Sequence, residues 1–145
     1  MRGLAEMGVA QIVSECGHLL MLGVNVQKLW RRMGLDVNDQ GGARKRESGV
    51  ANGYSPKRRS IMWNVGDVLV KTNRDGPYRT LYLERKAYEL AREPEMQPMR
   101  AHLRAQRFME KRLLKDLWRA WRAATSPGMT PDADLSPSPE LEAAA

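Results

Sequence analysis

The sequence MRAHLRAQRFMEKRLLKDLWRAWRAA, residues 99–124, decides the fold. Successive residues of an α-helix turn by about 100°, and at this angle one stripe of the segment is mostly apolar. The members of this stripe are Leu103, Gln106, Glu110, Leu113, Leu114, Leu117 and Trp121. A second face collects basic side chains, with Trp118 at its edge: Arg104, Arg107, Lys111, Lys115 and Arg122. The segment predicts a long helix with one packed face and one basic face that meets either a nucleic acid or water.

Helical periodicity continues toward the amino terminus. Pro77 begins a predicted helix that ends near Pro94, because proline cannot continue a helix. Another predicted helix begins at Pro56, with Ser55 as its N-cap. These two helices and residues 99–124 favour a mainly α fold.

Two shorter helices come first along the chain. Residues 4–16 have apolar side chains at helical spacing, and Gly17 is expected to end that helix. The next helix is expected to be capped by Asn25 and ended by Gly34. The pair predicts a helical hairpin over residues 1–35, either of the helix-hairpin-helix type or an ordinary packed αα-hairpin.

The remaining segments complete a one-domain organisation. Residues 36–56 form a basic, glycine-rich loop, and residues 57–124 form the helical region that completes the domain. Residues 125–145 are rich in Pro, Ser, Asp and Ala, which predicts a disordered tail. A chain of 145 residues is of ordinary size for a single core.

Composition excludes several kinds of chemistry. Cys16 is the single cysteine, so the chain can form neither an internal disulfide nor a cysteine-based zinc site. His18 and His102, the two histidines, lack partners at metal-ligand spacing. No P-loop, dinucleotide fingerprint or nucleophile elbow is present. The amino terminus lacks the apolar run of a signal peptide or membrane span, so we expect a cytoplasmic protein that does not bind membranes.

The net charge of +7 is concentrated in two segments. Residues 28–60 contain nine Lys and Arg against three Asp and Glu, and residues 101–124 contain seven against two. Lys and Arg that neutralise phosphates release counterions, so such segments favour salt-sensitive nucleic-acid binding. Besides the five cations named above on the basic face of residues 99–124, the predicted contacts are Lys28, Arg31, Arg32, Arg44, Lys45, Arg46, Lys57, Arg58 and Arg59. Solvated surface charge is the other interpretation.

The order of these features resembles a known family. Residues 4–17 and 26–35 look like the hairpin that opens the C-terminal domain of the DEDD-type insertion-sequence transposases. The Gly34-Leu35 step, the glycines at 41–42 and the basic helix start at 53–59 follow in the family's order. Later matches are Pro77-Tyr78-Arg79, Tyr82 and Arg85-Lys86, then Arg107, Met109, Lys111, Leu114, Trp118 and Trp121-Arg122. The resemblance covers residues 3–123 and lies in the order rather than in any one motif.

The resemblance implies a role in DNA transposition and recombination. In that family a RuvC-like domain carries the metal-binding acids, while the C-terminal domain supplies a serine nucleophile and DNA contacts. This sequence lacks the RuvC-like domain, so divalent metal is expected only there and no cofactor in this chain. The family serine is not found in residues 38–42, and Ser48 is the nearest candidate, without an evident base beside it. We therefore expect a DNA-binding fragment that is inactive alone.

Several partners and two other functions stay open. Expected partners are DNA, a structured RNA of the kind that guides some family members, a second copy of the chain, or a full-length transposase chain. One other function is a helical adaptor that binds a protein through Trp118 and Trp121. The remaining one is a recombinase fragment that uses Ser48.

Overall fold

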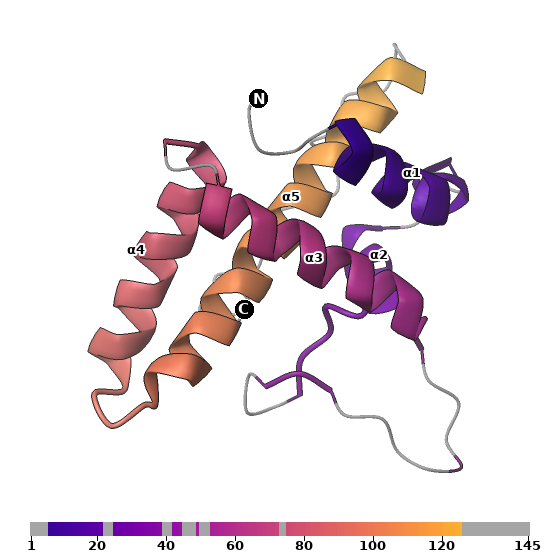
Figure 1. The fold of residues 1–145 in the computed structure, drawn as a ribbon. Coiled ribbons are helices and arrows are strands. Elements are labelled where there is room, and N and C mark those ends of the chain that lie inside the picture. Colours follow the sequence, from indigo (N-terminus) through magenta and orange to yellow (C-terminus); the bar gives the residue numbers. More distant parts are fainter. Residues whose placement is uncertain are drawn as a thin grey trace.

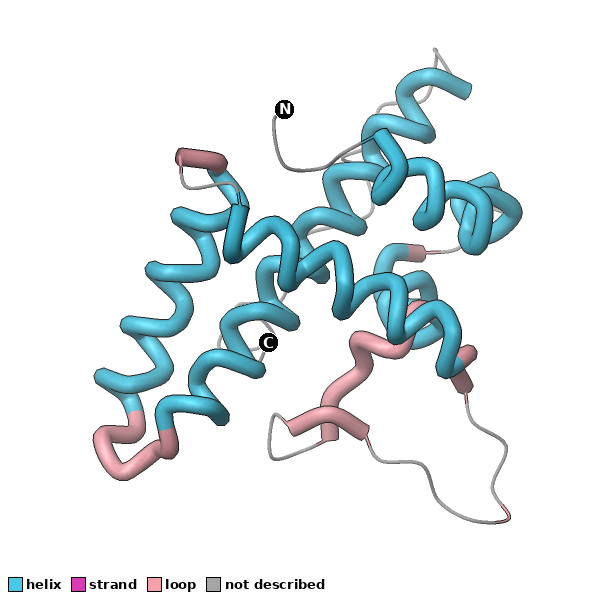
Figure 2. Tube along the Cα trace, in the orientation of Figure 1, coloured by secondary structure: helices cyan, strands magenta, loops and turns pink. Residues whose placement is uncertain are grey.

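The structure, a computed structural model, describes residues 6–21, 25–38, 42–44, 49, 53–72 and 75–125. Most of these residues lie in five helices (Figures 1 and 2). The helices are α1 (Glu6–Met21), α2 (Val26–Arg32), α3 (Pro56–Thr72), α4 (Pro77–Arg92) and α5 (Pro98–Thr125). Within the described part of the chain, β pairing is limited to an isolated antiparallel bridge between Val37 and Ala43. The prediction of a mainly α fold is confirmed. The predicted tail lies beyond Thr125 and outside the described residues.

Local capping and proline chemistry explain several of the helix boundaries. The Asn25 side-chain oxygen accepts a hydrogen bond from the Lys28 N–H at 2.9 Å, which caps α2 as predicted. Gly34 follows α2 with a φ of 78°, a left-handed conformation that favours glycine. Helices α3 and α4 begin at Pro56 and Pro77. Proline lacks a backbone N–H, but the first residue of a helix has no intrahelical acceptor for one, so no hydrogen bond is lost.

The prediction that Gly17 ends the first helix is wrong. Helix α1 continues through Gly17 to Met21. An interior glycine costs a helix about 1 kcal/mol relative to alanine. Burial of a large apolar side chain contributes more than that, and Ile12 and Cys16 of α1 are both fully buried. Packing of α1 therefore outweighs the local preference of Gly17.

Helix α5 is the centre of the fold. It packs along α4 and also contacts α1, α2 and α3 (Figure 1). Helices α1 and α2 are both present as expected, but α1 packs chiefly on α3 and α5, and α2 packs on α5. The apolar core draws from every helix and includes Ile12, Cys16, Leu29, Met33, Met62, Leu69, Tyr82, Met109, Leu114 and Trp118.

The contact between α4 and α5 buries a charged cluster as well as apolar side chains. Glu89 is 2% exposed. Its carboxylate forms ion pairs with the guanidinium groups of Arg85, at 2.6 Å, and Arg104, at 3.0 Å. Burial raises the pKa of Glu89, but hydrogen bonds from Arg104 and Arg85 outweigh it and hold this pKa below its ordinary value. The guanidinium carbon of Arg85 also lies 4.7 Å from the centroid of the Phe108 ring, where the cation and the aromatic face attract each other. The cluster fixes α4 against α5.

Replacing Glu89 with alanine should lower the free energy of unfolding by about 3 kcal/mol, because it leaves two arginines inside the protein without their shared carboxylate. Urea denaturation at neutral pH measures this loss as a lower midpoint. The matched control is Glu84→Ala, on the exposed side of the same helix. Equal midpoints for the two variants would show that the cluster contributes nothing to stability.

Candidate functional site

Three segments that meet near the end of α2 and the start of α3 carry seven cations, of which Arg58 and Arg59 are half-buried and the others exposed. We call these residues the basic surface: Lys28, Arg31, Arg32, Arg44, Lys57, Arg58 and Arg59. Arg31 and Arg44 lie 4.0 Å and 3.8 Å from the same Asp36 oxygen, which joins α2 to residues 42–44. A Cβ added at Gly34 would stand 2.8 Å from the Arg59 Cβ, so the end of α2 directly contacts the first turn of α3. All seven are among the predicted nucleic-acid contacts.

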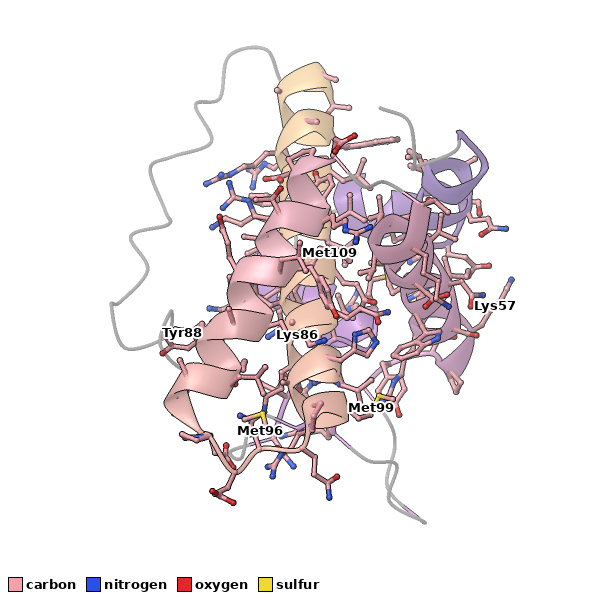
Figure 3. All side chains as sticks on the ribbon, turned by 60° about the vertical axis from the view of Figure 1, so that its left-hand side comes forward. Lys57, Lys86, Tyr88, Met96, Met99 and Met109 are labelled. Atoms are coloured by element: carbon pink, nitrogen blue, oxygen red, sulfur yellow. The ribbon has the colours of Figure 1, made fainter. Side chains whose placement is uncertain are left out.

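Within the part of the chain that the structure describes, two carboxylates form ion pairs with these cations. Asp36 lies between Arg31 and Arg44, and Glu15 of α1 forms an ion pair with Lys57. A hydrogen bond from Lys57 holds the pKa of Glu15 below its ordinary value. Lys57 stands at the outer edge of the molecule in Figure 3, with a side chain 73% exposed. Exposed ion pairs are weak, so phosphates can compete for these cations.

The predicted basic face of α5 is not a free surface, which corrects the expectation from the sequence. Lys111 is only 9% exposed, and its ammonium lies 5.3 Å from the centroid of the Trp30 ring. The Trp30 indole N–H donates to the Lys111 carbonyl oxygen at 3.0 Å. Burial lowers the pKa of Lys111, and nearby Arg107 lowers it further. Lys111 therefore belongs to the contact between α2 and α5.

Two other cations of this predicted face also have partners inside the chain. Arg104 belongs to the Glu89 cluster, Arg107 is partly exposed, and Arg122 lies 4.8 Å from the Trp118 ring centroid. Lys115 is partly exposed. The physical reason is that helices α1, α2, α3 and α4 all contact α5 and bury nine of its residues, Lys111 among them.

Trp118, which the adaptor alternative needs as a docking residue, is 3% exposed and belongs to the core. Trp121 packs against the same core. A protein partner cannot reach Trp118 without opening the fold.

Three predicted site residues, Lys45, Arg46 and Ser48, lie outside the described residues. Of the two histidines, His102 forms a 2.8 Å hydrogen bond through Nδ1 to the Tyr82 hydroxyl, whereas His18 is exposed. The described part of the chain contains no group of three or more His, Cys, Asp and Glu placed to hold a metal ion. None of its helices has the length and hydropathy that crossing a bilayer needs.

A small cavity adjoins the basic surface where α3 crosses α5. Its volume is about 140 Å³, and its lining residues are Gly34, Leu35, Ala43, Arg59, Trp63, Leu103, Gln106, Arg107 and Glu110. Gln106 donates from Nε2 to the Glu110 carboxylate at 2.9 Å and to the Trp63 carbonyl oxygen at 3.3 Å. The Gln106 Oε1 atom is buried without a hydrogen-bond partner. The cavity therefore combines apolar walls with polar groups whose hydrogen bonding is incomplete.

Glu110 is the most perturbed carboxyl group at this cavity. It is 4% exposed, and burial raises its pKa to about 7 despite the hydrogen bond from Gln106 and the charges of Arg107 and Arg59. Helix α3 can approach it closely only because residue 66 is glycine: an added Cβ would collide with the Glu110 carboxylate. A buried carboxyl that titrates near neutral pH beside a cavity is a candidate functional group.

Gln106 and Glu110 belong to the predicted packing stripe of residues 99–124, and Trp63 is not among the predicted site residues. The available signal was the presence of an amide and a carboxylate in an otherwise apolar stripe, one helical turn apart. Such a pair needs a polar partner when buried. Trp63, 45% exposed, gave no comparable signal because its exposure depends on how α3 sits on α5.

Comparisons with protein-family models, with curated proteins and with solved structures found no match to this chain. The transposase resemblance therefore stays a prediction from the sequence. The candidate site consists of the basic surface and the adjoining cavity, and its chemistry is interpreted from their geometry.

Because the pKa of Glu110 is raised, the free energy of unfolding should depend on pH. The folded state holds this proton up to about pH 7, whereas an unfolded carboxyl releases it near its ordinary value of 4.5. The contribution of Glu110 to stability is therefore greatest below pH 4.5 and falls as the pH rises through 7. The Glu110→Gln variant stays neutral, so it should exceed the wild type in stability by about 3 kcal/mol at pH 8 and differ little at pH 5.

Urea denaturation of both proteins at pH 5, 6, 7 and 8 measures this difference. The comparison cancels the opposite pH dependence of Glu89, which both proteins share. A stability difference that is the same at all four pH values would contradict the raised pKa.

Proposed function

We propose that the chain binds DNA through the basic surface. The observation that supports this function best is that α2, residues 42–44 and α3 meet and carry seven Lys and Arg, and that among the described residues only Glu15 and Asp36 form ion pairs with them. Each phosphate that a Lys or Arg neutralises releases counterions from the duplex, and this term supplies most of the affinity of non-specific DNA binding. Phosphate contacts also position a protein on DNA before any base is recognised.

The start of α3 gives the proposal a local physical reason. Lys57, Arg58 and Arg59 occupy the first turn of a helix whose amino-terminal N–H groups already carry a partial positive charge. Cations there repel that charge, at a small cost to the helix. A phosphate group bound at this end would be favoured by the side chains and by the helix dipole together.

The transposase resemblance adds the proposal that this DNA binding serves transposition. The coding DNA immediately upstream tests it: a RuvC-like region there, in frame or frameshifted, would support the tail of a transposase gene. Unrelated coding sequence would count against it. A structured RNA carries the same phosphate charge and is the natural competitor in binding experiments.

Binding of a fluorescent duplex, followed by anisotropy over a series of salt concentrations, tests the proposed surface. The variant Lys28→Ala/Arg32→Ala/Lys57→Ala removes three exposed cations that do not pack in the core. Because each lost phosphate contact lowers the slope of log affinity against log salt by about one, the slope should fall by about three, with weaker binding at every salt concentration.

The control variant Lys71→Ala/Arg100→Ala/Arg112→Ala removes the same charge from exposed positions away from the basic surface. It should keep a slope closer to that of the wild type. Equal loss in both variants would show that net charge alone drives binding. Unchanged binding in the first variant would rule out the proposed surface, and salt-insensitive binding of a specific protein would favour the adaptor alternative.

A further inference from the structure

The cavity at the α3–α5 crossing is continuous with the basic surface because Arg59 belongs to both. Arg59 lies in the first turn of α3, and its guanidinium donates to the Tyr54 hydroxyl at 3.3 Å. Arg107 adds a second guanidinium group to the cavity lining. A DNA strand whose phosphates contact the basic surface would therefore pass beside the cavity.

The size of the cavity limits what it can hold. Its volume of about 140 Å³ is roughly ten times the 10–15 Å³ that a cavity needs in order to hold one water molecule. It is well below the roughly 300 Å³ at which pockets for drug-sized ligands begin. The occupant is therefore a single ring system rather than a complete cofactor.

The chemistry of the lining matches a flat group with hydrogen-bonding edges. Trp63 lines the cavity and is 45% exposed, so its indole provides accessible aromatic surface at this point. Leu35 and Leu103 supply apolar walls. Gln106 Oε1 lacks a hydrogen-bond partner, and the Glu110 carboxyl beside it can accept or donate according to its protonation.

We infer that the cavity receives one unpaired base of a DNA strand held on the basic surface. The base stacks on Trp63, its polar edge meets Gln106 and Glu110, and the guanidinium groups of Arg59 and Arg107 face the adjoining phosphates. Recognition of this kind needs a base that is already out of the helical stack, because a paired base keeps its edge and its faces covered. The inference rests on the proposed function and makes it more specific: the preferred ligand is DNA with an unpaired nucleotide.

Three fluorescent duplexes that differ at one position test the inference with the full chain. One duplex is fully paired, the second carries a single unpaired nucleotide, and the third carries an abasic residue in place of that nucleotide. The second duplex should bind more tightly than the other two, by about 5- to 150-fold, the range that stacking of one base on an aromatic side chain supplies.

Trp63→Ala should abolish this preference and leave the affinity for the paired duplex within about twofold of wild type, whereas Trp63→Phe should retain most of it. The matched control is Tyr88→Ala, an aromatic residue of similar exposure on α4, at the opposite edge of the molecule from Lys57 in Figure 3. It should leave the preference intact. Circular dichroism confirms that each variant is folded.

Equal affinities of the wild type for all three duplexes would overturn the base pocket and leave the proposed DNA binding standing. A preference that survives in Trp63→Ala would also overturn it. Failure of the wild type to bind any duplex would instead overturn the proposed function, and the base pocket with it.

Discussion

The whole structure depends on the burial of α5 by the other four helices. A helix in a surface layer can divide itself into one packed stripe and one solvated face, but α5 contacts α1, α2, α3 and α4. Its charged residues consequently need partners within the protein, because an unpaired charge in the interior is costly. Glu89 of α4 supplies one for Arg104, and Trp30 of α2 covers the ammonium of Lys111. Arg104 and Lys111 of α5 thus hold neighbouring helices in place, and the basic surface is built from α2, residues 42–44 and the start of α3 instead.

The crossing of α3 over α5 illustrates how packing creates a site. Gly66 lets the two helices approach closely, and Glu110 and Gln106 lie at that crossing. Apolar side chains in their place would have completed the core. A carboxyl and an amide keep hydrogen-bonding capacity there instead, and the adjoining cavity gives small groups access to it. This arrangement lowers stability at neutral pH, as the raised pKa of Glu110 indicates, which is a cost that proteins commonly accept at binding sites.

The sequence predicted local features better than tertiary ones. Asn25, Pro56 and Pro77 fixed helix starts because capping and proline geometry depend on neighbouring residues only. The helix end predicted at Gly17 was wrong because the packing of Ile12 and Cys16 overrides the weak local effect of that glycine. Periodicity predicted one basic stripe on α5, but it cannot show how many other helices cover that stripe. For the same reason, the cavity could not be predicted, since Trp63, Gln106 and Glu110 meet only when α3 crosses α5.

The shortness of α2 has a consequence for how the molecule assembles. Seven residues are too few for a stable isolated helix, and α2 is held through buried Val26 and Leu29 and the bond from Trp30 to α5. Helices α4 and α5, by contrast, are joined by only residues 93–97 and close a short loop at little entropic cost. We therefore expect the α4–α5 pair to form early and α2 to dock late, so that the cations come together only in the last step. Native-state hydrogen exchange in which α2 amides are as protected as those of α4 and α5 would contradict this order.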